Sequence, residues 1–175
     1  MTSIRRAGIM AAVITCVFLA APQSGQPQTQ DKQPKAESEQ VTKLFEAMRK
    51  GEYKGLEFPK LALSDVPALL ELADSTTLLK SIPSNPLSSI AVFECREGVM
   101  ALWLIEGIRK GGKYASLVPI CLKTGEQGVK GGTTSEATQQ EAAKAYREWW
   151  RRAKSLQPED AMKLEPFKGT ELRWR

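Results

Sequence analysis

Histidine is absent from the 175-residue sequence. Because histidine is the usual general base near neutral pH and the commonest metal ligand, its absence excludes Ser-His-Asp and Cys-His triads, HExxH zinc sites and two-histidine iron sites. An enzyme built on this chain would have to use carboxylates, lysine, tyrosine or thiols. We therefore expect neither a metal nor a cofactor.

Strong charge of one sign is lacking as well. The formal net charge is +5, and it falls to +3 if Arg5 and Arg6 are lost with the N-terminal segment. This excess is well short of the clustered basic footprint of nucleic-acid-binding proteins. The glycine-rich segment 123–134 also lacks the GxxxxGK[ST] spacing of a phosphate-binding loop. We expect no nucleic-acid partner.

Long hydrophobic runs are scarce, and the longest lies at the N-terminus. Arg5 and Arg6 precede the run 7–21, after which the sequence turns polar at once. This order is typical of a secretory signal peptide, here residues 1–22, and predicts a periplasmic or extracellular protein without a transmembrane span in its mature form. An uncleaved signal would instead tether the protein. Residues 23–37 hold no large apolar side chain, which predicts a disordered linker.

The remaining residues, 38–175, suffice for a single domain. Its longest apolar stretch is 88–110, where only Glu106 and Gly107 interrupt the apolar part from Val99 to Ile108. A helix that is apolar on nearly all sides is a buried helix, so this stretch predicts the centre of the core. We expect the helix to begin at Ser88 or Ser89.

Helical periodicity recurs before and after that stretch. It predicts one helix over residues 38–50, a second from about residue 64, and a long helix that begins at the capping-box pair Thr133 and Glu136 and ends before Pro158. The expected buried stripe of the long helix consists of Ala142, Ala145, Tyr146, Trp149, Ala153 and Leu156. Residues 170–174 alternate as an extended tail would. The predicted fold class is all-α: a compact helical domain around one buried central helix.

The two cysteines outside the signal segment are Cys95 and Cys121. An even pair in an exported protein indicates a disulfide, which would close a loop of roughly 26 residues and contribute about 3 kcal/mol. The alternative is two separate buried thiols. A catalytic thiol is disfavoured because no histidine is available to activate it.

Three glutamates are candidates for chemistry. A carboxylate at Glu106 beside an apolar helix face suits a general acid, whereas Arg109 and Lys110, at i+3 and i+4, suit a structural ion pair. Glu94 and Glu97 lie one turn apart if both are helical, so they could form a paired-carboxylate hydrolase site or a solvated polar turn.

Basic and aromatic residues alternate near the end of the long helix. Arg147, Trp150, Arg151 and Arg152 could bind a sugar, a membrane or an anionic polymer. The alternative interpretation places Tyr146 and Trp149 in the core and leaves the arginines as a solvated face. We retain those four residues as the candidate binding residues.

Four segments carry a resemblance to known proteins: VPALLELAD (66–74), ALWLIEGIRKG (101–111), AYREWW (145–150) and PFKGTELRW (166–174). Together they resemble a group of small exported bacterial proteins of unknown function, and the helix pairs resemble HEAT-like repeats. Such repeats need about three copies to bury their faces, so a single compact α-hairpin domain is the expectation. The resemblance assigns no catalytic residues.

These observations lead to three functional hypotheses. The first is a non-enzymatic exported module that binds another protein or an envelope component, because the recognisable patterns serve packing or export. The second is a carboxylate-dependent hydrolase that uses Glu106 or the pair Glu94 and Glu97. The third is an interaction with an anionic polymer through Arg147, Arg151 and Arg152.

Overall fold

The computed structural model describes residues 35–55, 57–83, 85–88, 94–125 and 133–175. The predicted signal peptide, residues 1–22, and residues 23–34 of the predicted linker lie outside this part of the chain. The first helix begins at Lys35, inside the segment expected to be linker. Among the described residues, every helix is too short or too polar to cross a bilayer.

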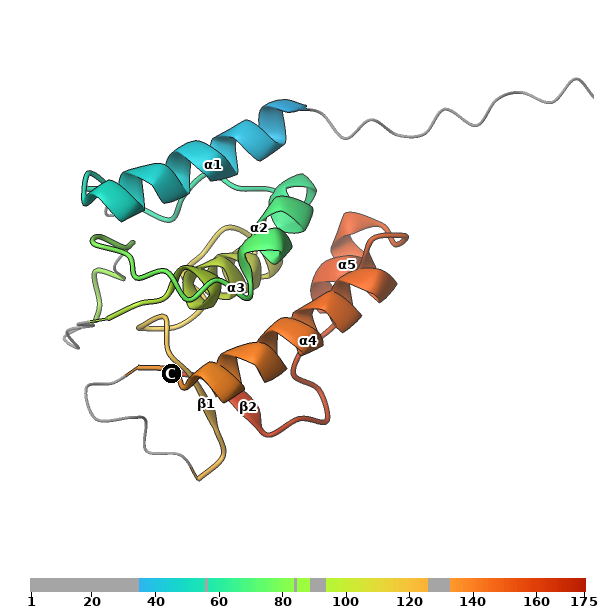
Figure 1. Cartoon of the computed structure of the whole chain (residues 1–175). Helices are drawn as coiled ribbons and strands as arrows, with labels where there is room; N and C mark the ends of the chain where they lie inside the picture. Colours follow the sequence, from blue (N-terminus) through green and yellow to red (C-terminus); the bar gives the residue numbers. More distant parts are fainter. Residues whose placement is uncertain (1–34, 56, 84, 89–93, 126–132) are drawn as a thin grey trace, which may run out of the picture. The chain divides into compact units, whose positions relative to one another are not determined.

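The described residues are mostly helical, and a small sheet joins two distant segments (Figure 1). In chain order the elements are α1 (Lys35–Lys50), the 3-10 helix η1 (Leu63–Asp65), α2 (Val66–Leu72), α3 (Glu97–Arg109), β1 (Cys121–Lys123), α4 (Glu136–Ala153), α5 (Pro158–Lys163) and β2 (Leu172–Trp174). The two strands are antiparallel, with Leu122 opposite Arg173. The predicted all-α class is therefore corrected to mostly helical, because the alternating tail finds a partner strand.

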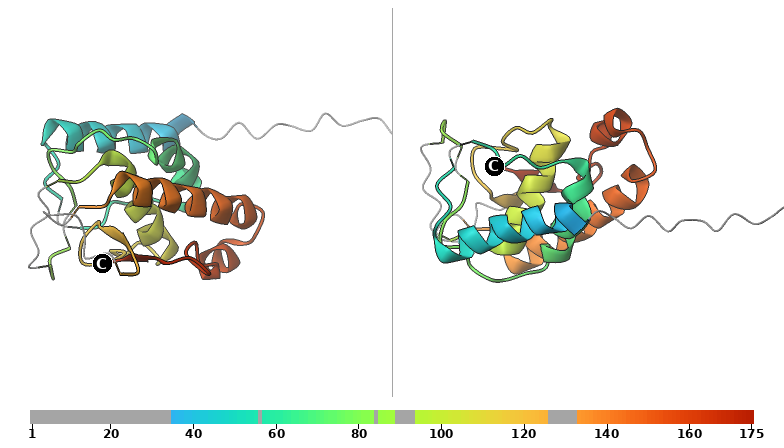
Figure 2. Two further views of the ribbon diagram at one scale, coloured as in Figure 1. Left: turned by 60° about the horizontal axis from the view of Figure 1, so that its bottom comes forward. Right: turned by 90° about the horizontal axis from the view of Figure 1, so that it is seen from above.

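Helix α3 is the centre of the core. Every residue from Glu97 to Ile108 is buried, which confirms the prediction of a buried central helix. Figure 1 shows α3 between α1 and α4, and the left view of Figure 2 shows α3 crossing α4. Because this helix has no solvated face, its three polar or charged groups near the ends, Glu97, Glu106 and Arg109, must find partners within the protein.

The predicted start of α3 at Ser88 or Ser89 is wrong. Residues 89–93 lie outside the described part, but Glu94 and Cys95 are not helical and Arg96 is the extended N-cap. The cause is backbone pairing, because Arg96 forms a β-bridge with Leu78. The first amides of the helix, which have no intrahelical acceptor, donate instead to carbonyls of that neighbouring segment: Glu97 to Thr77 at 2.8 Å and Gly98 to Ser75 at 3.1 Å.

Gly98 allows this close approach. A β-carbon at this position would collide with the backbone carbonyl of Ala73 and the side-chain amide of Gln139. That same amide donates hydrogen bonds to the carbonyls of Ala73 (3.1 Å) and Ser75 (3.0 Å). The end of α2, the start of α3 and α4 therefore meet at one point with no room for a side chain.

Helix α4 buries the predicted stripe over most of its length. Ala142, Tyr146, Trp149 and Ala153 are each at most 1% exposed. Three details of the prediction are wrong. Ala145 is only half-buried, and Ala143 is buried in its place. The N-cap is Ser135, whose hydroxyl accepts from the amide of Thr138 at 3.1 Å, and Leu156 is 44% exposed because the helix ends at Ala153.

Candidate functional site

Glu106 lies at the centre of a buried polar network. Arg109, one turn later in α3, donates to both of its oxygens, through Nε to Oε2 at 2.9 Å and through Nη2 to Oε1 at 2.6 Å. The hydroxyl of Tyr146 donates to Oε2 at 2.8 Å, and the ammonium of Lys110 lies 3.7 Å from Oε1. The structure therefore brings Glu106 and Arg109 together, and both carboxylate oxygens face donors of this chain.

The same network holds α5 and the C-terminal tail. Arg109 uses its remaining Nη1 to donate to the carbonyl of Met162 at 3.0 Å, and the indole of Trp174 donates to the Tyr146 hydroxyl at 2.9 Å. The hydrogen bond with Glu106 raises the pKa of Arg109 although burial opposes the shift. Burial, and then the charge of Glu106, raises the pKa of Tyr146 well above its usual value. Both groups keep their protons at physiological pH.

Glu97 and Glu94 do not form a carboxylate pair. Glu97 is only 3% exposed. Its carboxylate accepts hydrogen bonds from Arg49 of α1 and from the Ser75 hydroxyl, the latter at 2.6 Å. Glu94 is exposed and precedes the helix, where it lines a cavity of about 160 Å³ together with Cys95 and Thr134. The expectation that both lie one turn apart on a helix is corrected, because α3 begins only at Glu97.

Cys95 and Cys121 do not form the predicted disulfide. Both side chains are buried, and no disulfide joins them. Cys95 lies in the segment that pairs with Leu79, through the Leu79 amide and the Cys95 carbonyl at 3.0 Å, whereas Cys121 lies in β1 opposite Trp174. The predicted bridge required Cys95 to belong to the central helix, which begins only after it. Burial raises the pKa of Cys95 to about 12, so this thiol is no nucleophile near neutral pH.

The four candidate binding residues of α4 have different partners. Arg147 pairs with Asp74 at 2.5 Å, and Arg151 pairs with Glu148. Trp150 is half-buried, and its ring packs on Trp149 with 5.8 Å between centroids. Of the four, only Arg152 lines the groove between α4 and the segment after α5.

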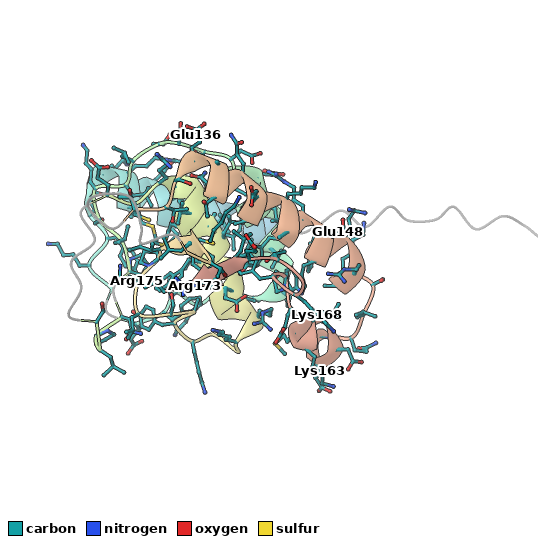
Figure 3. The ribbon with its side chains drawn as sticks, turned by 90° about the horizontal axis from the view of Figure 1, so that it is seen from below. Glu136, Glu148, Lys163, Lys168, Arg173 and Arg175 are labelled. Carbon is teal, nitrogen blue, oxygen red and sulfur yellow. The ribbon has the colours of Figure 1, made fainter. Side chains whose placement is uncertain are left out.

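That groove, of about 470 Å³, runs between α4 and the segment that leads from α5 to β2. We call it the α4–tail groove. Its lining residues are Glu141, Lys144, Ala145, Glu148 and Arg152 from α4, and Pro166, Lys168, Thr170 and Leu172 from the tail. Figure 3 shows Glu148 on α4 and Lys168 on the segment after α5. The α4 residues follow helical spacing, so they form one strip along the helix.

The sequence did not single out Lys144 and Lys168, because a lone lysine on a solvated face carries no local signal. Only the approach of the tail to α4 makes these residues opposite walls of one groove. Among the described residues, no cluster of three potential ligands is placed to hold a metal ion.

Fold and site together define a small, mostly helical domain with a charged groove on one helix. A family described as a domain of unknown function (DUF4943) matches residues 35–175, and the chain belongs to it. No curated protein matches the chain. No solved structure matches it either.

Proposed function

We propose that the domain is a non-enzymatic binding module of an exported protein, and that it binds another protein or an envelope component in the α4–tail groove. One contrast supports this proposal. The buried carboxylates Glu97 and Glu106 are held by donors of this chain, whereas Lys144, Arg152 and Lys168 in the groove have no ion pair with any residue the structure describes. The groove therefore presents three cations that no acidic side chain of the described residues neutralises.

The arrangement of the carboxylates disfavours the hydrolase hypothesis. General acid-base catalysis requires a carboxylate within hydrogen-bond reach of a substrate, with a second group facing the same bound molecule. Glu106 is 5% exposed and its oxygens are engaged by Arg109 and Tyr146. Glu94 lines a separate small cavity, so it does not face Glu106 across a cleft.

The proposal that the protein is exported rests on residues 1–22, in which two arginines are followed by an apolar run. An exported module meets its partners in the envelope or outside the cell. The partner is therefore sought in the cells from which the protein comes, under native conditions.

Site-specific photo-cross-linking tests this proposal. A benzoyl-phenylalanine at position 170, which is exposed and lines the groove, is compared with one at position 54, which is exposed in the segment after α1. After irradiation of intact cells, we expect a discrete higher-mass adduct from position 170 and none from position 54. Equal adducts from both positions, or none from position 170, would contradict the proposal.

A further inference from the structure

We infer that the α4–tail groove takes an extended, acidic segment of a partner protein, with carboxylates about four residues apart. This inference rests on the proposed function and adds the chemistry of the ligand. Three features of the groove support it: its charges, their spacing and the apolar residues between them.

The charge of the groove is the first feature. Both carboxylates of its α4 wall already have cations of their own: Glu141 pairs with Lys123 at 2.5 Å and Glu148 with Arg151. The cations of the groove are exposed, and within the part of the chain that the structure covers no acidic side chain pairs with them. These cations are Lys144, Arg152 and Lys168. The groove therefore attracts carboxylates more than ammonium groups.

The spacing of the cations is the second feature. Lys144 and Arg152 are eight residues apart on one helix, which corresponds to about 12 Å along the axis at 1.5 Å per residue. In an extended chain, residues i and i+4 point to the same side and lie about 13 Å apart. Two carboxylates at that spacing would reach both cations, and Lys168 on the opposite wall would face the segment between them.

The apolar residues distinguish a protein segment from a uniform polyanion. Ala145, Pro166 and Leu172 line the groove between the charges, and Pro166 and Leu172 are buried within the domain. A protein segment with two separated acidic residues and small apolar side chains between them would place its carboxylates at the cations and its apolar side chains at the apolar lining of the groove.

The test uses the full-length protein and three fluorescein-labelled pentapeptides. The acidic probe is Glu-Val-Thr-Val-Glu, and Gln-Val-Thr-Val-Gln and Lys-Val-Thr-Val-Lys are its controls. In fluorescence anisotropy we expect the acidic probe to bind at least about tenfold more tightly than the glutamine probe, with an affinity that falls as salt is added. No binding of the acidic probe at 1 mM, or equal binding of the three probes, would overturn the inference.

Charge-reversal variants locate the site. K144E/R152E/K168E should weaken binding of the acidic probe by about tenfold or more, whereas the matched control K54E/K60E/K113E, which reverses three exposed lysines outside the groove, should change it by less than about threefold. Equal losses in both variants would mean that net charge, and not the groove, binds the probe. Stronger binding of a heparin oligosaccharide than of the probe at the same residues would also overturn the inference.

If the triple variant misfolds, the binding site can still be located by measuring amide chemical-shift changes of the wild-type protein on addition of the acidic probe. The acidic probe should shift resonances of residues 141–152 and 166–172, and shifts elsewhere would contradict the assignment. A discrete cross-linked adduct from position 170 without binding of the acidic probe would leave the proposed function standing and reject the ligand chemistry.

Discussion

The hydroxyl of Tyr146 in α4 donates a hydrogen bond of 2.8 Å to Oε2 of Glu106 in α3, and both side chains are buried. The same hydroxyl accepts from the Trp174 indole at 2.9 Å. One oxygen atom thus connects the central helix, the long helix and the last strand.

Replacing Tyr146 by Phe should destabilise the domain. The change leaves an indole donor and part of a buried carboxylate without a partner, at a cost of about 1–3 kcal/mol. Urea unfolding measures the loss, and hydrogen exchange should show earlier opening of β2. The control is Tyr53→Phe, because the Tyr53 hydroxyl bonds an exposed carbonyl of Glu57. Equal effects of the two variants would contradict the assigned role.

Replacing Arg109 by Met should cost more. It leaves the buried carboxylate of Glu106 without its main cation, and breaking a buried pair in this way costs about 3–5 kcal/mol. The matched change Arg151→Met removes an exposed pair with Glu148 and should cost less than about 1 kcal/mol. Denaturant midpoints of the two variants provide the comparison, and a stable Arg109→Met protein would refute the structural role of the pair.

Gly98→Ala should destabilise the domain although alanine is the better helix former by about 1 kcal/mol. The new methyl group would collide with the carbonyl of Ala73 and the amide of Gln139, and overpacking of this kind costs about 1–3 kcal/mol. Thermal unfolding tests the sign. A higher melting temperature for Gly98→Ala would show that the junction of α2, α3 and α4 is looser than described.

Ionisation of the Cys95 thiol should lower the free energy of unfolding at alkaline pH. Its pKa is raised from 9.0 to about 12 in the folded state, because burial disfavours the thiolate. Its stabilising contribution is complete below pH 9 and is lost as pH rises towards about 12, with a steepest slope of about 1.4 kcal/mol per pH unit. Urea titrations between pH 8 and 11 should show a shallower decline for Cys95→Ala than for wild type. Parallel declines would argue against this origin.

Alkylation should distinguish two buried thiols from a disulfide. Cys95 is 5% and Cys121 1% exposed, so iodoacetamide should leave both peptides unmodified in the native protein and label both in guanidinium without reductant. Peptide mapping by mass spectrometry gives the result. A disulfide-linked peptide pair, which denaturant alone does not render reactive, would contradict the structure.

Local patterns predicted the parts of the fold that depend on local residues. The apolar run around Leu102 specified a buried helix, and helical spacing placed Tyr146 and Trp149 in the core. Glu106 and Arg109 are one helical turn apart, and this spacing predicted the ion pair that the structure contains. The HEAT-like arrangement and the signal peptide remain predictions.

Contacts between segments far apart in the chain could not be predicted from local sequence patterns. Because Arg96 pairs with Leu78, α3 begins only at Glu97. Cys95 therefore lies outside the helix, and the geometry on which the predicted disulfide was based does not occur. The contacts of Arg49 with Glu97 and of Trp174 with Tyr146 join residues far apart in the chain, for which no spacing rule exists. The groove depends on such a contact as well, since Lys168 meets α4 only through the folded tail.

The central claim is that Glu106 serves packing and that the α4–tail groove serves binding. The most direct test measures the yield of the cross-linked adduct from position 170 in the groove, in an otherwise wild-type protein and in Glu106→Gln, each normalised to the folded fraction. We predict equal yields, because a glutamine at this position would retain the shape of the buried site without its charge. Loss of the adduct in folded Glu106→Gln would contradict the account.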